Sequence, residues 1–332
     1  MQRKYDSCED GEGKMNIEDI CTDFINDLPS ITIIDGAWRT FRFIAQYDDI
    51  HCSVSGGSDS DCMIDILCRM DKKRKIVYDF FDTKIEMQAT KKHLDELETK
   101  YGIKINRYDA IKSVPVACSH YGIPFLSKKI SEYIYRLQIH NFNFIDGTFE
   151  ELYEKYPNCK AALRWWCNAF GEKSRMNIER NKLLKEFMIQ NPPQFLISPR
   201  CCDYAKKKTA DKYGKCELQL VGIRKSEGGA RSTTYTTCFA DGKHGKQHFP
   251  LFWWDDAQKQ YYKEWAGIKY SDAYEVYGCK RTGCAGCPFG SGFEDELSML
   301  KQFEPNLYKA CNNIFGKSYN YMRQYRDFKK GK

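Results

Sequence analysis

An apolar segment runs into two adjacent glycines and then into a helical pattern in the sequence CSVSGGSDSDCMIDILCRM. Residues 50–55 carry little charge and suit a buried strand. The residues after the glycines repeat at the spacing of one helical face, at Met63, Ile64, Ile66, Leu67 and Met70. Gly56 and Gly57 therefore lie at a strand-to-helix corner, where glycine can adopt backbone angles that other residues avoid. The corner is typical of a phosphate-binding loop, because the following amides point outward from a helix N-terminus. A simple turn with a helix N-cap is the alternative.

Further along the chain, strand patterns alternate with helical patterns. Strands are expected at 50–55, 76–81, 103–107 and 218–223. Such alternation implies parallel pairing with right-handed crossovers, which predicts an α/β fold: a Rossmann-like parallel sheet with helices on both faces. Ligands of such sheets bind beyond the carboxyl ends of the strands, where Gly56, Gly57 and Asp82 would lie.

The pattern divides the chain into three parts. We expect a disordered tail at 1–14, a nucleotide-binding α/β domain at 15–240, and a small cysteine-bearing C-terminal module with a basic tail at 241–332. Segment 125–190 is expected to be mostly helical. His244 and His248 flank a glycine-containing turn that is expected to be exposed.

Composition limits the setting of the protein. The sequence contains no apolar run of membrane-spanning length, and its N-terminus lacks the apolar core of a signal peptide, so we expect a cytoplasmic protein without a membrane partner. Sixteen cysteines in a reducing compartment favour metal binding, redox chemistry or burial over disulfides. The net charge of +7 is concentrated in runs at 72–75, 206–208 and 323–332. These runs form either solvated faces or a surface that attracts nucleic acid.

Two pairs of cysteines have the spacing of metal ligands. Cys284 and Cys287 form a Cys-x-x-Cys turn between glycines, which lets two thiolates converge on one centre. Cys201 and Cys202 form a tandem pair beside the basic run at 206–208.

Several segments together resemble a known family. The SGGSDS corner is similar to the PP-loop of the N-type ATP pyrophosphatases and of their relatives, the phosphoadenosine phosphosulfate (PAPS) reductase family. Further blocks of that family are matched in order by VYDFFDT at 77–83, YGIPFLSKKIS at 121–131, GIRKSEGGAR at 222–231 and RTGCAGCP at 281–288. The resemblance spans about residues 50–316.

The resemblance implies roles for named residues. It implies that ATP with Mg²⁺ is held by the corner residues Ser55, Gly56, Gly57, Ser58, Asp59 and Ser60. Asp59 would lie near the metal, and Asp82 with Thr83 would lie near adenosine or metal. Positive charge for the phosphates or for a second substrate would come from Lys128, Arg224 and Arg231. Outside the motif, each of these three would be an ordinary surface cation.

The cysteine pattern resembles the [4Fe-4S] signature of the adenylyl sulfate reductases in the same family. It implies a cluster at Cys201, Cys202, Cys284 and Cys287, with Cys279 or Cys238 as alternative members in place of one of the tandem pair. The same thiolates could instead hold Zn²⁺ as a structural clip, or no metal.

Two departures from the reductases decide among the branches of the family. The chain lacks their C-terminal Glu-Cys-Gly tail, so that Cys311 is its last cysteine, and its phosphate loop is intact and suits a triphosphate. Both favour an ATP-using branch, similar to the cluster-bearing enzymes of DNA phosphorothioation and tRNA thiolation. There ATP adenylates a tRNA or DNA acceptor, pyrophosphate leaves, and a sulfur donor of the cysteine desulfurase type displaces AMP. Reduction of adenylyl or phosphoadenylyl sulfate through Cys311, and a non-catalytic nucleotide- or nucleic-acid-binding module with a zinc clip, are the alternatives.

Overall fold

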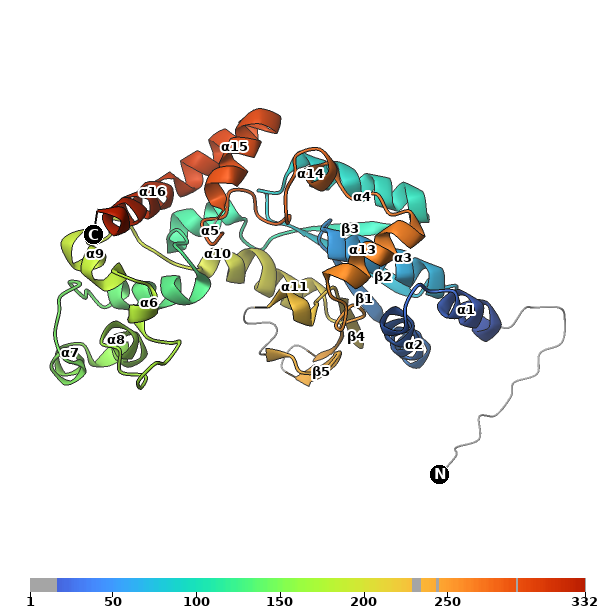
Figure 1. The fold of residues 1–332 in the computed structure, drawn as a ribbon, viewed down its shortest axis with the longest axis horizontal. Coiled ribbons are helices and arrows are strands. Elements are labelled where there is room, and N and C mark those ends of the chain that lie inside the picture. Colours follow the sequence, from blue (N-terminus) through green and yellow to red (C-terminus); the bar gives the residue numbers. More distant parts are fainter. Residues whose placement is uncertain (1–16, 229–233, 243–244, 291, 332) are drawn as a thin grey trace, which may run out of the picture. The chain divides into compact units, whose positions relative to one another are not determined.

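The structure, a computed structural model, describes residues 17–228, 234–242, 245–290 and 292–331. Within these residues six strands form one sheet in the order β3-β2-β1-β4-β6-β5 (Figure 1). The strands are β1 (Ile50–Val54), β2 (Ile76–Asp82), β3 (Ile105–Asp109), β4 (Leu218–Val221), β5 (Phe239–Gly242) and β6 (Gly245–His248). β1 and β4 are parallel, with Ile50 opposite Leu218, and β4 and β6 are also parallel, whereas β5 is antiparallel to β6. The predicted α/β fold with a mostly parallel sheet is confirmed.

The last two strands and the environment of His248 differ from expectation. β5 and β6 are short and polar, so they lack the apolar alternation by which the other strands are recognised. The expected exposure of His248 is wrong, because its side chain is buried in β6. Its ring lies 2.9 Å from both Thr40 Oγ1 and the Cys238 carbonyl oxygen, and burial lowers the pKa of His248 to about 4. His244 lies outside the described residues.

The chain forms two compact units, each built from separate segments. The described part of the first unit comprises 17–54, 58–78, 216–228, 234–242 and 245–269, and that of the second comprises 55–57, 79–215, 270–290 and 292–331. The predicted domains 15–240 and 241–332 are each one continuous segment, whereas the two compact units are not. The bounds of these domains therefore stay a prediction. The predicted tail at 1–14 lies outside the described residues.

The first unit packs helices around β1, β4, β5 and β6. Its helices are α1 (Ile17–Asn26), α2 (Ile31–Gln46), α3 (Ser58–Met70), α13 (Asp256–Ala266) and the short 3-10 turn η4 (Lys225–Glu227). α2 begins at the Ser30 cap, whose hydroxyl accepts a bond from the Ile33 amide, and α13 begins with a capping box between Asp255 and Gln258. α13 contacts α3, and Tyr262 donates a 2.7 Å hydrogen bond to the buried Asp65.

The second unit is mainly helical, as the sequence predicts for 125–190. Its helices are α4 (Gln88–Tyr101), α5 (Val114–Tyr121), α6 (Lys128–Ile139), α7 (Phe149–Lys155), η1 (Pro157–Cys159), α8 (Lys160–Trp166), η2 (Ile178–Arg180), α9 (Leu184–Gln190), α10 (Arg200–Cys202), η3 (Asp203–Lys207), α11 (Lys208–Tyr213), α14 (Asp272–Glu275), α15 (Phe293–Phe303) and α16 (Pro305–Lys330). Trp165 and Trp166 are buried in its core. α10, η3 and α11 form one helical run whose middle turn, η3, is a π-helix.

No helix in the described part of the chain combines the length and apolar character that a membrane crossing requires.

Candidate functional site

The glycine corner has the geometry that the sequence predicts. β1 ends at Val54 and α3 begins at Ser58, and Gly56 between them has φ +63°. A Cβ atom on Gly56 would lie 2.7 Å from Thr90 Cγ2, which is closer than two carbon atoms can pack. The Gly57 amide donates to Ser55 Oγ over 3.3 Å. The corner therefore requires glycine for both its backbone angle and its close packing.

Alanine at Gly56 should destabilise the chain by about 2–4 kcal/mol, from a left-handed backbone cost and the forced contact with Thr90. Gly102 is the matched control, because it has φ +60° and open space where a Cβ would lie. Gly102→Ala should cost only about 1 kcal/mol. In a Thr90→Ser background the cost of Gly56→Ala should shrink by about 1 kcal/mol, as urea unfolding would measure. Equal costs for the two alanine variants would refute the packing explanation.

The start of α3 carries a carboxylate held by two cations. Arg224 Nε donates to Asp59 Oδ1 over 2.9 Å, and Lys259 Nζ lies 3.2 Å from the same oxygen. Lys259 also donates to Ser58 Oγ over 3.2 Å. Burial lowers the pKa of the Arg224 guanidinium, but the interactions with Asp59 and Asp256 raise it by more, so the pKa lies above its usual value. Two cations are thus concentrated where the first turn of α3 begins.

Lys259 is a candidate that the sequence analysis missed. It lies in the first turn of α13, which begins after the Asp255 cap, and only the packing of α13 on α3 brings it to Asp59. Arg224 is held in addition by Ser226 Oγ, which accepts from its Nη1 over 3.0 Å. Arg231 lies outside the described residues.

Asp82 ends β2 and lies between two lysines. Its Oδ1 accepts from the Lys84 amide over 2.7 Å, and its Oδ2 lies 3.2 Å from Lys84 Nζ and 3.1 Å from Lys91 Nζ. Burial opposes ionisation, but the Lys84 amide and the Lys91 ammonium lower the pKa of Asp82 to about 2. Asp82 is therefore a stable anion at neutral pH.

Thr83 links β2 to the cysteine turn. It is fully buried, and its hydroxyl donates to Glu86 Oε1 over 2.5 Å and lies 3.6 Å from Cys284 Sγ. Burial raises the pKa of Glu86. Thr282, two residues before Cys284, would lie 3.1 Å from a Cβ on Gly57. The Cys-x-x-Cys turn thus begins beside the second glycine of the corner.

The four predicted metal-ligating cysteines lie in one neighbourhood of the second unit. Cys201 and Cys202 are on α10, and Cys284 and Cys287 are in the turn before α15. Burial first, and then the neighbouring Cys284 and Cys202, raise the pKa of Cys287 to about 12. Contact with the Cys118 thiol raises the pKa of Cys201, and contact with Cys201 followed by burial raises that of Cys202. The thiols therefore keep their protons near neutral pH.

Two lysines face this group of thiols. Part of the Lys206 side chain is exposed, but protein surrounds its ammonium group. The interaction with Cys284 raises the pKa of Lys206 by more than desolvation lowers it. Lys128 is the first residue of α6, and its positive charge lowers the pKa of Cys202, against the rise that Cys201 and burial cause. By sequence, Lys206 was noted only as part of a basic run and Cys118 was not singled out, because neither a lysine run nor a helical cysteine has a distinguishing spacing.

The alternative members are placed differently. Cys279 Sγ contacts Met87 Sδ at 4.0 Å, and Cys238 belongs to the first unit. No disulfide joins any of the cysteines within the described ranges. No three or more His, Cys, Asp or Glu side chains in those ranges are grouped closely enough to hold one metal ion. The four predicted cysteines nevertheless supply thiols with cations beside them, which is the donor chemistry of a thiolate-held centre.

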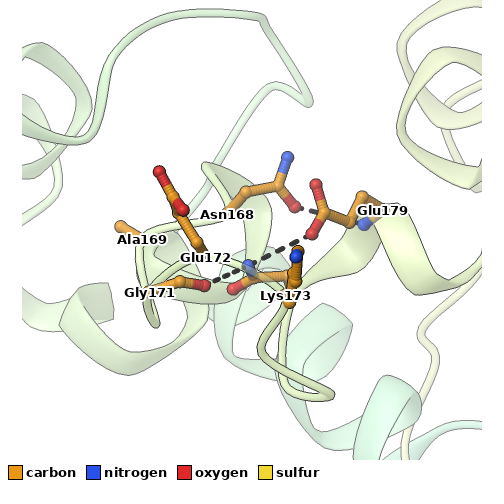
Figure 2. A pocket seen from close by; sticks show the side chains of 7 residues that line it. Asn168, Ala169, Gly171, Glu172, Lys173 and Glu179 are labelled. Atoms are coloured by element: carbon orange, nitrogen blue, oxygen red, sulfur yellow. Dashed lines mark hydrogen bonds between the residues drawn. The ribbon is translucent and has the colours of Figure 1, made fainter.

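A hollow of about 690 Å³ lies elsewhere in the second unit, beside the segment between α8 and η2 (Figure 2). Its lining consists of Asn168, Ala169, Gly171, Glu172, Lys173, Asn177 and Glu179. The polar groups bond to one another, since Asn168 Oδ1 accepts from the Glu179 amide over 3.1 Å and Asn177 donates to the Gly171 carbonyl over 3.0 Å. None of the predicted site residues lines this hollow.

The sheet order and the glycine corner define a Rossmann-like α/β protein. Residues 49–140, from β1 to the end of α6, match the family model of the phosphoadenosine phosphosulfate reductase domain. The match confirms, over these residues, the resemblance predicted from the motifs, and it includes the corner, Asp82, Thr83 and Lys128.

Two solved structures are similar to the chain. Phosphoadenylyl-sulfate reductase from Candida auris, in a phosphate complex, is 13% identical over 82% of this chain and 98% of that one, with a TM-score of 0.40. FMN adenylyltransferase from Candida glabrata is 9% identical over 81% of this chain and 69% of that one, with a TM-score of 0.37. The comparison with curated proteins found no significant match to the sequence.

Proposed function

We propose that the chain binds ATP with Mg²⁺ at the glycine corner and adenylates an acceptor, with release of pyrophosphate. The adenylated acceptor then receives sulfur. The observation that carries the proposal is the corner itself, where a left-handed Gly56 joins a buried strand to α3 and Arg224 and Lys259 gather at the first turn of that helix. The family match supports, at the coarser level, an enzyme of sulfonucleotide-related chemistry.

The corner supplies what departure of pyrophosphate needs. An acceptor oxygen forms a bond to the α-phosphorus of ATP while the bond to the β-phosphate oxygen breaks, and negative charge develops on the leaving group. Amides at the start of α3 and the two cations stabilise that charge. In the free chain both cations pair with Asp59, which holds them at the corner. In the complex the phosphates would compete for these cations, and Asp59 would then be available as a ligand of Mg²⁺.

We further propose that Cys201, Cys202, Cys284 and Cys287 hold a [4Fe-4S] cluster. A four-iron cluster is larger than one ion, so its thiolates lie further apart than those around a single zinc. With each of its four irons held by one of these thiolates, such a cluster would supply electron-transfer chemistry. Lys206 and Lys128 would offset the negative charge of the thiolates, and Thr83 would hold Cys284 in place.

One observation bears on the alternative of sulfonucleotide reduction. Cys311, the nucleophile that this alternative needs, is fully buried on α16 and donates to the Ala285 carbonyl over 3.4 Å. Burial first, and then Glu296, raise the pKa of Cys311 to about 12. A protonated, buried thiol is a poor nucleophile, which favours the adenylating function.

Pyrophosphate release separates the functions. Oxygen-free protein is incubated with ATP and Mg²⁺, with and without bulk tRNA or single-stranded DNA, and released pyrophosphate is measured. We expect release that rises at least about tenfold with the acceptor, because adenylation needs an oxygen to attack. Sulfite release from adenylyl sulfate with a thiol, and no pyrophosphate, would instead establish the reductase. ATP binding without turnover would establish the non-catalytic module.

A further inference from the structure

Two stacked tyrosine pairs lie along the helical run that carries Cys201 and Cys202. The rings of Tyr121 and Tyr204 are 4.5 Å apart at an interplanar angle of 3°, and those of Tyr108 and Tyr213 are 4.5 Å apart at 14°. All four side chains are partly exposed. Tyr204 and Tyr213 lie on η3 and α11, nine residues and thus about 13 Å apart along the helix.

The partner rings come from segments packed against this helix. Tyr108 is in β3 and Tyr121 ends α5, and both elements contact the helical run. The Ile111 amide donates to Thr209 Oγ1 over 3.1 Å, which fastens the segment after β3 to α11. The two pairs are therefore held on a rigid support.

Lysines alternate with these rings. Lys208 Nζ is 3.9 Å from the Tyr204 ring centroid, and Lys212 Nζ is 4.7 Å from that of Tyr213. Lys112 Nζ lies 4.8 Å from the Tyr121 ring and 5.4 Å from the Tyr204 ring. Residues 200–215 carry six Lys or Arg against two Asp, so this helical run has a net positive charge. We call Tyr108, Lys112, Tyr121, Tyr204, Lys208 and Tyr213 the tyrosine–lysine surface.

We propose that the tyrosine–lysine surface binds single-stranded nucleic acid. This inference rests on the proposed function, because the surface would be the place where the nucleic-acid acceptor docks. Bases stack on aromatic faces, and lysines between the rings neutralise phosphates. A duplex keeps its bases stacked on one another, so exposed rings favour an unpaired strand. Cation–ring contacts at exposed sites are weak, so a base can displace Lys208 from Tyr204 and move its ammonium to a phosphate.

The position of the surface fits this role. Tyr204 follows Cys202 by two residues, and Lys206 between Tyr204 and Lys208 points its charge toward Cys284. The π-turn η3 thus directs neighbouring lysines to two places, one to the thiols and one to the rings. A strand bound to the rings would lie within about three helical turns of Cys202.

Fluorescence anisotropy of labelled 12-nucleotide single strands, RNA and DNA, tests the proposal with the full chain. Tyr204→Ala should weaken binding at least about fivefold without changing its salt dependence. Lys208→Ala should also weaken it, and should reduce the slope of log affinity against log salt by about 0.7. Tyr204→Phe should bind like the parent because it keeps the stacking ring.

Lys160→Ala is the matched control. Lys160 Nζ also lies over a tyrosine ring of the second unit, 5.4 Å from Tyr153, but outside the surface. Its removal costs the same charge and should leave affinity within about twofold. Unchanged binding by Tyr204→Ala and Lys208→Ala would overturn the proposal. It would also be overturned if an acidic peptide of matched charge bound with the same affinity as the single strands and lost the same affinity in both variants.

The outcome is independent of turnover, because binding is measured without ATP. A chain that binds strands through these residues but releases no pyrophosphate supports the surface and removes the adenylation. A chain whose pyrophosphate release depends on nucleic acid, but whose binding ignores Tyr204 and Lys208, keeps the adenylation and removes the surface.

Discussion

Replacing Asp59 with alanine should reduce pyrophosphate release from ATP at least about 100-fold, or about 2.7 kcal/mol in activation free energy. One oxygen of this carboxylate holds Arg224 at 2.9 Å and Lys259 at 3.2 Å. The variant loses the group that positions both cations at α3, and it loses the carboxylate proposed to approach Mg²⁺. Initial rates at saturating ATP and Mg²⁺ measure the effect.

Asp256→Ala is the control for this experiment. Asp256 Oδ1 also lies 2.9 Å from Arg224, but its side chain is 89% exposed. An exposed ion pair contributes little, so the rate should stay within about twofold of the parent. Unchanged release by Asp59→Ala would remove the proposed role of Asp59. Equal losses in both variants would show that only the position of Arg224 matters.

Replacing Cys284 with serine should remove bound iron from protein purified without oxygen. The parent should contain about four iron atoms per chain, and the variant less than about a tenth of that amount, because a hydroxyl is a weak ligand for an iron–sulfur cluster. Cys284 is the member of the group in contact with Thr83 and Lys206, so its loss also removes the fixed point of the turn. Iron analysis and the visible absorption spectrum measure the change.

Cys279→Ser and Cys238→Ser are matched controls with the same loss of a thiol. Cys279 packs against Met87, and Cys238 packs against the apolar cluster of Ile223, Phe249 and Phe252, so both variants should keep the iron of the parent. One zinc and no iron in the parent would contradict the cluster and support the zinc clip. Iron that persists in Cys284→Ser and disappears in Cys279→Ser would reassign the ligand.

Local patterns were sufficient to predict the glycine corner and the central strands. Gly56 has the left-handed backbone that two adjacent glycines between a strand and a helix suggest. β1, β2 and β4 each bury apolar residues at alternating positions, so their positions agree with the prediction to within a few residues. β5 and β6 could not be found in this way, because a sheet edge made of polar residues leaves no periodic signal.

The grouping of the cysteines was predicted from spacing, but their surroundings were not. The two cysteine pairs share a neighbourhood because Cys201 interacts with Cys287 and Cys202 interacts with Cys284, which only the tertiary fold decides. For the same reason Lys259 at Asp59 and Cys118 at Cys201 escaped notice. Their neighbours in sequence give no indication of these contacts.

The structure of a crystal grown with Mg²⁺ and a non-hydrolysable ATP analogue would test the central claim most directly. Phosphate oxygens are predicted to lie about 3 Å from the main-chain nitrogens that follow Gly56, at the start of α3. Arg224 and Lys259 are predicted to turn from Asp59 toward the phosphates. An analogue bound elsewhere, with Arg224 and Lys259 still paired to Asp59, would contradict the proposed phosphate site.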